Sequence, residues 1–208
     1  MPPRKPVNLH RISLCRGQAC LYPLLHPTLC TVKNIIYYTA LLLTTLSLSA
    51  VEPALEGSRV REALDALQGK PAPELQLKGW INSKALNLNQ LKGKIVVLDF
   101  WATWCGPCIA SIPHTNELMG KYANKGVVII GVCAQRGAEK IEATVKDRGI
   151  NYPVAVDQGT NAAYKANSYP DYYIIDRKGV LRWADIVNRD VEKAINHLLA
   201  EKPEASSK

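Results

Sequence analysis

Apolar residues in this chain form two long uninterrupted runs, followed by segments of alternating or helical spacing. The runs at 95–102 and 127–134 are almost wholly apolar, which is typical of strands buried on both faces of a sheet. The further elements predicted from spacing are a helix at 105–125, a helix at 137–149, a strand at 152–157, a helix at 159–167, a hairpin at 171–186 and a helix at 190–201. Because strands alternate with helices, we expect an α/β protein with a three-layer α/β/α sandwich.

These elements are expected to form one domain over residues 71–200. Alternation over 75–88 predicts an N-terminal β-hairpin at the start of that domain, after two prolines that mark its boundary. Residues 51–70 are expected to be a linker that permits a helix, and residues 201–208 a disordered tail.

The N-terminal region carries a stretch typical of an export signal. Residues 35–50 are uncharged and mostly apolar, follow Lys33, and are shorter than the about 20 residues that a spanning helix usually needs. We therefore expect residues 32–50 to be a signal peptide cleaved after Ser49 or Ala50, or else an anchor that is retained. Either outcome delivers the domain across the membrane, with membrane contact only through this segment.

Residues 1–31 show no apolar period and are expected to be an unstructured extension. We hypothesise that translation starts near Val32, because the signal would then have an ordinary length and these residues would not be translated. The expected location is the periplasm or the outer face of the cytoplasmic membrane.

The net charge of +8 is concentrated at the N-terminus. The first fifty residues contain five basic residues and no acidic one, so the rest of the chain has only a mild surplus of basic over acidic residues, which does not favour nucleic-acid binding.

Three of the six cysteines also lie in the first thirty residues. The other three are Cys105, Cys108 and Cys133, too few for a disulfide scaffold, and Cys133 is expected to be an inert apolar filler.

The motif Trp-Cys-Gly-Pro-Cys at 104–108 stands where a buried strand gives way to a helix. A thiol at a helix N-terminus faces unpaired backbone N–H groups and the positive end of the helix dipole, which favours its thiolate. We therefore predict that Cys105 is the nucleophile. Cys108 lies on the same helical face and can attack a mixed disulfide formed by Cys105.

Three other uses of this cysteine pair are weaker. A zinc site needs two more ligands, yet His114 and His197 stand alone, and haem attachment needs a histidine where the chain has Ile109. A purely structural disulfide over so short a loop would constrain the unfolded chain little. The pattern favours redox chemistry, with no metal and no cofactor expected.

Asp99 is a lone carboxylate within the first buried run. Burial should raise its pKa, so that it could accept the proton of Cys108. The alternative is a core acid satisfied by a nearby lysine or by water.

The segment DFWATWCGPC at 99–108 resembles the active site of the thioredoxin superfamily. An additional strand and helix before residue 169, together with the export signal, resemble its TlpA-like branch of thiol-disulfide oxidoreductases, which is grouped with the alkyl hydroperoxide reductase and thiol-specific antioxidant family. The resemblance covers about 70–200 and implies a thioredoxin-like fold with a mixed sheet and an inserted strand and helix. It assigns Cys105 as the attacking thiol and Cys108 as the resolving thiol of a redox-active disulfide. Asp99 matches the buried acid behind them.

The same resemblance implies a substrate-binding surface. Pro170 matches the cis-proline that faces the disulfide, and the backbone of Tyr169 would pair with substrate, so that Trp104 and Tyr169 form an aromatic rim beside the cysteines. Departures from the branch include Ser111, where many members have Glu, Asp171, where they have Thr, and residues 184–187, where their loop commonly contains Gly. These departures affect substrate identity rather than chemistry.

The Gly-Pro dipeptide between the cysteines resembles reducing members of the superfamily. The chain is therefore expected to reduce disulfides of exported proteins as a monomer, with apocytochrome c a special case that the family implies. Electrons would come from a membrane dithiol donor, since the soluble cytoplasmic reductase cannot reach the outer side.

Two other functions remain open. A peroxiredoxin-like thiol peroxidase would need Thr three residues before its reactive cysteine and Pro further upstream, but the chain has Ala102 there and no such proline. A redox-silent adaptor with a thioredoxin fold predicts that serine replacements of Cys105 and Cys108 retain full biological activity.

Overall fold

The computed structural model describes residues 52–57 and 59–201. The predicted extension at 1–31, the signal or anchor at 32–50 and the tail from 202 onwards lie outside these described residues. Within the described ranges, no helix combines the length and the apolar character needed to cross a bilayer.

A six-stranded sheet forms the centre of the domain, in the order β1-β4-β3-β2-β5-β6. The pairs β2·β3 and β3·β4 are parallel, whereas β1, β5 and β6 pair antiparallel with their neighbours. The strands are β1 (Leu77–Ile81), β2 (Ile95–Trp101), β3 (Val127–Cys133), β4 (Val154–Asp157), β5 (Asp171–Ile175) and β6 (Leu181–Ile186). The predicted mixed sheet, with its inserted strand, is therefore confirmed.

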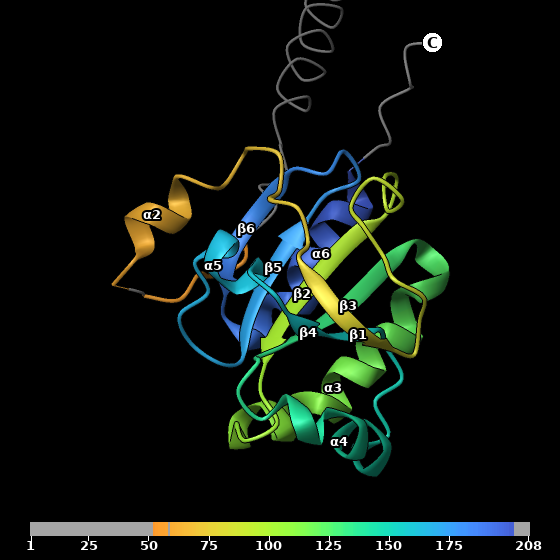
Figure 1. Cartoon of the computed structure of the whole chain (residues 1–208). Coiled ribbons are helices and arrows are strands. Elements are labelled where there is room, and N and C mark those ends of the chain that lie inside the picture. Colours follow the sequence, from red (N-terminus) through yellow and green to blue (C-terminus); the bar gives the residue numbers. More distant parts are fainter. Residues whose placement is uncertain (1–51, 58, 202–208) are drawn as a thin grey trace, which may run out of the picture. The chain divides into compact units, whose positions relative to one another are not determined.

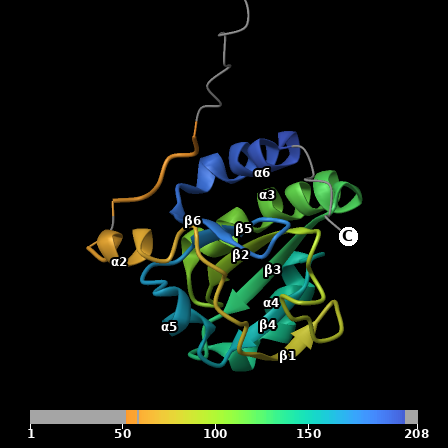
Figure 2. The same cartoon turned by 90° about the horizontal axis from the view of Figure 1, so that it is seen from above.

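Helices cover both faces of this sheet, as the two cartoon views show (Figure 1, Figure 2). The buried residues of α3, α4 and α6 belong to one core cluster, and those of α2 and α5 belong to the other. The helices are α2 (Arg61–Asp65), α3 (Gly106–Tyr122), α4 (Ile141–Arg148), α5 (Thr160–Tyr164) and α6 (Val191–Ala200), with single 3-10 turns at η1 (Ala123–Lys125), η2 (Ala138–Lys140) and η3 (Asn188–Asp190). The three-layer prediction is confirmed.

Strand β2 is buried along its whole length because it lies between β3 and β5 in the middle of the sheet. Its side chains alternate between the two cores: Val97 and Trp101 face the layer of α3, and Leu98 and Phe100 face the opposite layer. By the same alternation, Asp99 faces the layer that contains α3. The carboxylate predicted to serve the cysteines therefore lies on their side of the sheet.

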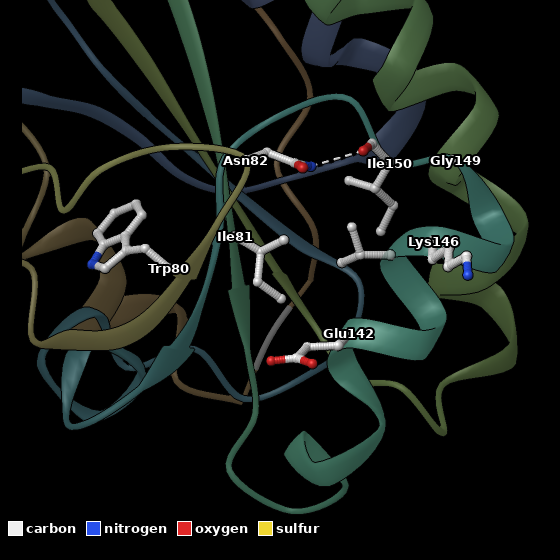
Figure 3. Close-up of a pocket in the computed structure, with 8 residues that line it drawn as sticks. Trp80, Ile81, Asn82, Glu142, Lys146, Gly149 and Ile150 are labelled. Carbon is white, nitrogen blue, oxygen red and sulfur yellow. Dashed lines mark hydrogen bonds between the residues drawn. The ribbon is translucent and has the colours of Figure 1, made fainter.

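The predicted N-terminal hairpin is wrong. Strand β1 pairs with β4, and no other strand within residues 52–57 and 59–201 lies beside it, because the chain after Ile81 turns towards the loop before β4. The Asn82 amide donates a hydrogen bond to the carbonyl oxygen of Ile150 at 2.8 Å (Figure 3). It donates a second one to the carbonyl oxygen of Tyr152 at 3.1 Å. Leucines further on, including Leu88, are drawn into the core rather than into a second strand. Alternation alone could not distinguish these two outcomes.

The segment expected to be a linker is part of the folded unit. Leu55 forms an antiparallel bridge with Ile186 of β6, and the Arg61 guanidinium donates to the carbonyl oxygen of Ala184 at 3.0 Å. Leu64 of α2 is fully buried. The domain therefore extends upstream of residue 71, over the edge of β6.

Leu64→Ala tests whether this segment contributes to stability. Emptying a fully buried leucine site should lower the free energy of unfolding by about 2–5 kcal/mol. Glu62→Ala in the same short helix is the control, since Glu62 is exposed and its loss should change stability by less than about 0.5 kcal/mol. Urea unfolding monitored by circular dichroism measures both, and equal stabilities would show that the segment is only a linker.

Candidate functional site

The two cysteines of the motif form a disulfide between the end of β2 and the first turn of α3. The S–S distance is 2.05 Å, and Cys105 and Cys108 are only 5% and 2% exposed. Trp104, directly before them, is 52% exposed. The sulfur atoms therefore lie just below the surface, next to a large apolar side chain that solvent can reach.

Local structure explains why the chain places a reactive sulfur here. Cys105 is the N-cap of α3 with an extended backbone, and its Sγ accepts a hydrogen bond from the Cys108 N–H at 3.2 Å. Pro107 occupies the first turn, where a helix leaves backbone N–H groups unpaired in any case. A thiolate on Cys105 would meet this donor and the positive end of the helix dipole, which favours the charged form.

Asp99 is buried, with 2% exposure, and burial raises its pKa to about 7. One of its carboxylate oxygens has no hydrogen-bond partner among the described residues. The same carboxylate raises the pKa values of Tyr152 and Tyr172, in addition to the effect of their own burial. Asp99 can thus exchange a proton near neutral pH, on the α3 side of the sheet.

A short hydrogen-bonded chain connects the neighbourhood of Asp99 with α3. Tyr172 stands opposite Asp99 in the β2–β5 register, and its hydroxyl donates to Ser111 Oγ at 3.3 Å. The Ser111 hydroxyl in turn donates to the carbonyl oxygen of Cys108 at 2.8 Å. Ser111, identified in the sequence only as a departure from the TlpA-like pattern, therefore braces the first turns of α3 against β5.

The second loop of the site precedes β5. The Tyr169–Pro170 peptide bond is cis, and the ring of Tyr169 meets Trp104 edge to face, with centroids 5.9 Å apart. The Tyr169 hydroxyl accepts a hydrogen bond from the Asn161 amide at 2.7 Å. The structure therefore brings together Trp104 and Tyr169, two aromatic residues from loops that lie far apart in the chain.

Just past this loop, Asp171 and Asp185 form a buried acid pair that sequence reasoning did not identify as a pair. They are 1% and 2% exposed, and burial together with the neighbouring charge of Asp185 raises the pKa of Asp171 to about 8. Arg61 lies 3.7 Å from Asp185. Since Asp171 faces the layer opposite to α3, this pair lies under the loop rather than beside the sulfur atoms.

Cys133 is a free, fully buried thiol whose pKa burial raises to about 12. It therefore stays protonated, in keeping with the prediction of an apolar filler.

A pocket of about 570 Å³ lies between β1 and α4, lined by Ile81, Glu142 and Lys146 among others (Figure 3). It includes none of the predicted site residues.

The fold and the paired cysteines define a class of domain, the thioredoxin-like domains that carry a Cys-x-x-Cys pair. Within that class, the AhpC/TSA family model matches residues 68–184, more than half of the chain. The chain belongs to the AhpC/TSA family.

Individual relatives are similar over the same region. The thiol-disulfide oxidoreductase ResA of one Bacillus cereus strain is 39% identical over 113 residues, which covers 53% of this chain and 65% of ResA. A ResA from another Bacillus cereus strain is 33% identical over 149 residues, 71% of this chain and 85% of that protein. A solved thioredoxin-like protein in its oxidized form superimposes with a TM-score of 0.56 and 30% identity, covering 64% of this chain and 97% of that structure.

Proposed function

We propose that this chain is an exported thiol-disulfide oxidoreductase that reduces disulfides of exported proteins. The observation that carries the proposal is the Cys105–Cys108 disulfide at the N-terminus of α3, next to an exposed tryptophan. Names of relatives support the activity, and the apolar N-terminal stretch supports export.

The reaction would proceed in two exchanges from the reduced form. Cys105 thiolate attacks one sulfur of a substrate disulfide, so that a mixed disulfide forms and the other substrate sulfur leaves as a thiolate. Cys108 then passes its proton to Asp99 and attacks Cys105 Sγ, which releases the second substrate thiolate. The substrate gains two electrons, and the cysteine pair returns to its disulfide form.

The remaining parts of the proposal concern partners and location. Trp104 and Tyr169 form the rim that meets substrate, and Pro170 lies between that rim and β5. A membrane dithiol protein returns electrons to the disulfide, because a donor on the outer side is required once the domain has been exported. Proteolysis of intact spheroplasts tests location: the domain should be degraded without lysis, and full protection would contradict export.

A redox titration of the full chain tests whether the domain reduces or oxidises its substrates. The midpoint of the Cys105–Cys108 couple is expected nearer to about −270 mV than to about −120 mV, since the Gly-Pro dipeptide resembles that of reducing members. Mass spectrometry after alkylation at each glutathione or dithiothreitol ratio measures it. A potential close to that of the strong oxidant would reverse the proposed direction.

The family match also favours one alternative, a thiol peroxidase, because the family name includes alkyl hydroperoxide reductases. Ala102 occupies the place where such an enzyme would need Thr. Peroxide consumption by the reduced chain, measured without any added dithiol carrier, separates the two functions. Turnover there, together with inertness towards protein disulfides, would favour the peroxidase.

A further inference from the structure

The loop between β3 and η2 is tied to the residues directly before Cys105. The Trp104 indole N–H donates to the carbonyl oxygen of Arg136 at 2.8 Å, and the Thr103 hydroxyl donates to the carbonyl oxygen of Gly137 at 2.8 Å. The exposed tryptophan of the rim is therefore held through its ring nitrogen by the backbone of a loop that is distant in the chain.

Gly137 is the point of closest approach between that loop and the site. Its φ is +84°, and a Cβ there would lie 2.6 Å from Thr103 Oγ1 and 2.8 Å from Trp104 Cδ1. Both distances are shorter than real Cβ contacts, so any side chain at this position would displace the tryptophan or the threonine. The position thus sets where the Trp104 ring stands.

Arg136 adds a charge to the same surface. Its guanidinium lies 5.2 Å from the centroid of the Trp104 ring, within the range of a cation–π contact, and its side chain is exposed. Throughout residues 52–57 and 59–201, no carboxylate forms an ion pair with it. A cation without an acidic partner in this part of the chain therefore lies over the exposed indole of the proposed substrate rim.

We propose that Arg136 and Gly137 select substrates at this site: Gly137 is a positioning residue for Trp104, and Arg136 gives the rim a preference for disulfides flanked by carboxylates. The proposal rests on the proposed disulfide-reducing function. It identifies the substrate class as protein loops with an acidic residue next to the cystine, because a guanidinium on an aromatic surface attracts a carboxylate and repels a lysine.

Gly137→Ala tests the positioning role, with Gly126→Ala as a matched control. Gly126 also has a φ of +84°, but a Cβ there meets only Cδ of the Lys94 side chain, at 3.7 Å, an ordinary van der Waals contact. Both variants bear the same backbone strain. Using the reduced full chain and insulin as substrate, we expect Gly137→Ala to lower kcat/KM about tenfold, mainly by raising KM, whereas Gly126→Ala stays within about twofold.

A double variant separates positioning from general destabilisation. In a Trp104→Ala background, adding Gly137→Ala should lower kcat/KM by less than about twofold: the added methyl group still crowds the Thr103 hydroxyl, but the ring whose position matters for substrate is already absent. An undiminished tenfold loss in that background, or equal losses for Gly126→Ala and Gly137→Ala, would overturn the positioning role.

Arg136→Glu tests the preference for disulfides flanked by carboxylates. The substrates are two disulfide-bonded peptides that differ only in having Glu or Lys beside one cysteine. The unchanged chain should reduce the acidic peptide about threefold to fivefold faster, the scale of an exposed ion pair, and Arg136→Glu should invert that ratio. Lys92→Glu is the control, since it changes the net charge equally at the opposite end of β2 and should keep the original ratio.

The outcomes distinguish this proposal from the function on which it rests. If the unchanged chain reduces neither peptide, the proposed function fails. If it reduces both, and Arg136→Glu leaves their ratio unchanged, only the substrate preference is refuted.

Discussion

Cys105→Ser should lower the reduction of protein disulfides by about a thousandfold or more, because the nucleophile of a covalent mechanism supplies most of the rate enhancement. The fold should survive, since serine is close to cysteine in size and the helix N-terminus accepts serine as a cap. Insulin reduction by the full chain measures the rate, and circular dichroism checks the fold.

Cys108→Ser should behave differently from Cys105→Ser. The attacking thiol is still present, but nothing resolves the mixed disulfide, so a covalent complex with substrate should accumulate. Non-reducing gels and peptide mapping would locate the bond at Cys105. Trapping through the wrong cysteine, or full activity of both serine variants, would contradict the assigned roles and favour an adaptor.

Asp99→Asn should change how stability depends on pH. The pKa of Asp99 is about 7 in the fold and about 3.9 in an unfolded chain, so the folded state binds the proton more tightly. Its stability therefore falls as pH rises from about 4 to above 7, where the buried carboxylate must ionise. Between pH 4 and pH 9, the variant should gain about 4 kcal/mol relative to the unchanged chain.

Urea unfolding of both oxidised proteins at several pH values measures this difference. Comparing slopes rather than absolute stabilities removes the constant cost of burying an amide in place of the carboxyl group. Other groups that titrate in this range, Asp171 among them, contribute equally to both proteins. Parallel pH curves would show that Asp99 has an ordinary pKa.

The same variant should slow the second exchange, because an amide cannot accept the Cys108 proton. A loss of about a hundredfold in the release of substrate from the mixed disulfide is expected near pH 7, with the first exchange much less affected. Rapid-quench alkylation separates the two steps. If both steps slow equally, Asp99 acts on packing rather than as a proton acceptor.

Patterns of local origin could be predicted from the sequence. Strands β2 and β3 follow from two continuous apolar runs, and the N-terminus of α3 follows from the motif at 104–108. The position of Asp99 on the α3 side follows from alternation along a strand. Each of these depends on neighbours in the chain, which a sequence displays directly.

Features that depend on distant pairing could not be predicted. The 75–88 segment alternates like a hairpin, but β4 offers β1 a better partner and Asn82 ties the turn to the next loop. Residues 51–70, which include Leu64, are predicted to be a linker because nothing in that segment indicates that it packs against β6 and that Leu64 is buried. Tertiary contacts decided both cases.

In the candidate site, too, only some of the contacts could be predicted from the sequence. Trp104 and Tyr169 were expected to form a rim, whereas the contacts of Arg136 and Gly137 with Trp104 connect residues that no motif relates. A glycine after a strand is common at any turn, so its positive φ and its close approach to the ring appear only in three dimensions.

The central claim is that Cys105 and Cys108 cycle between dithiol and disulfide while reducing a protein disulfide. Mixing the reduced full chain with insulin and counting thiols over time by alkylation and mass spectrometry tests it directly. We predict that each insulin disulfide opened is matched by one Cys105–Cys108 disulfide formed. Insulin that stays oxidised at the uncatalysed rate, while both thiols remain free and open to alkylation, would contradict the account.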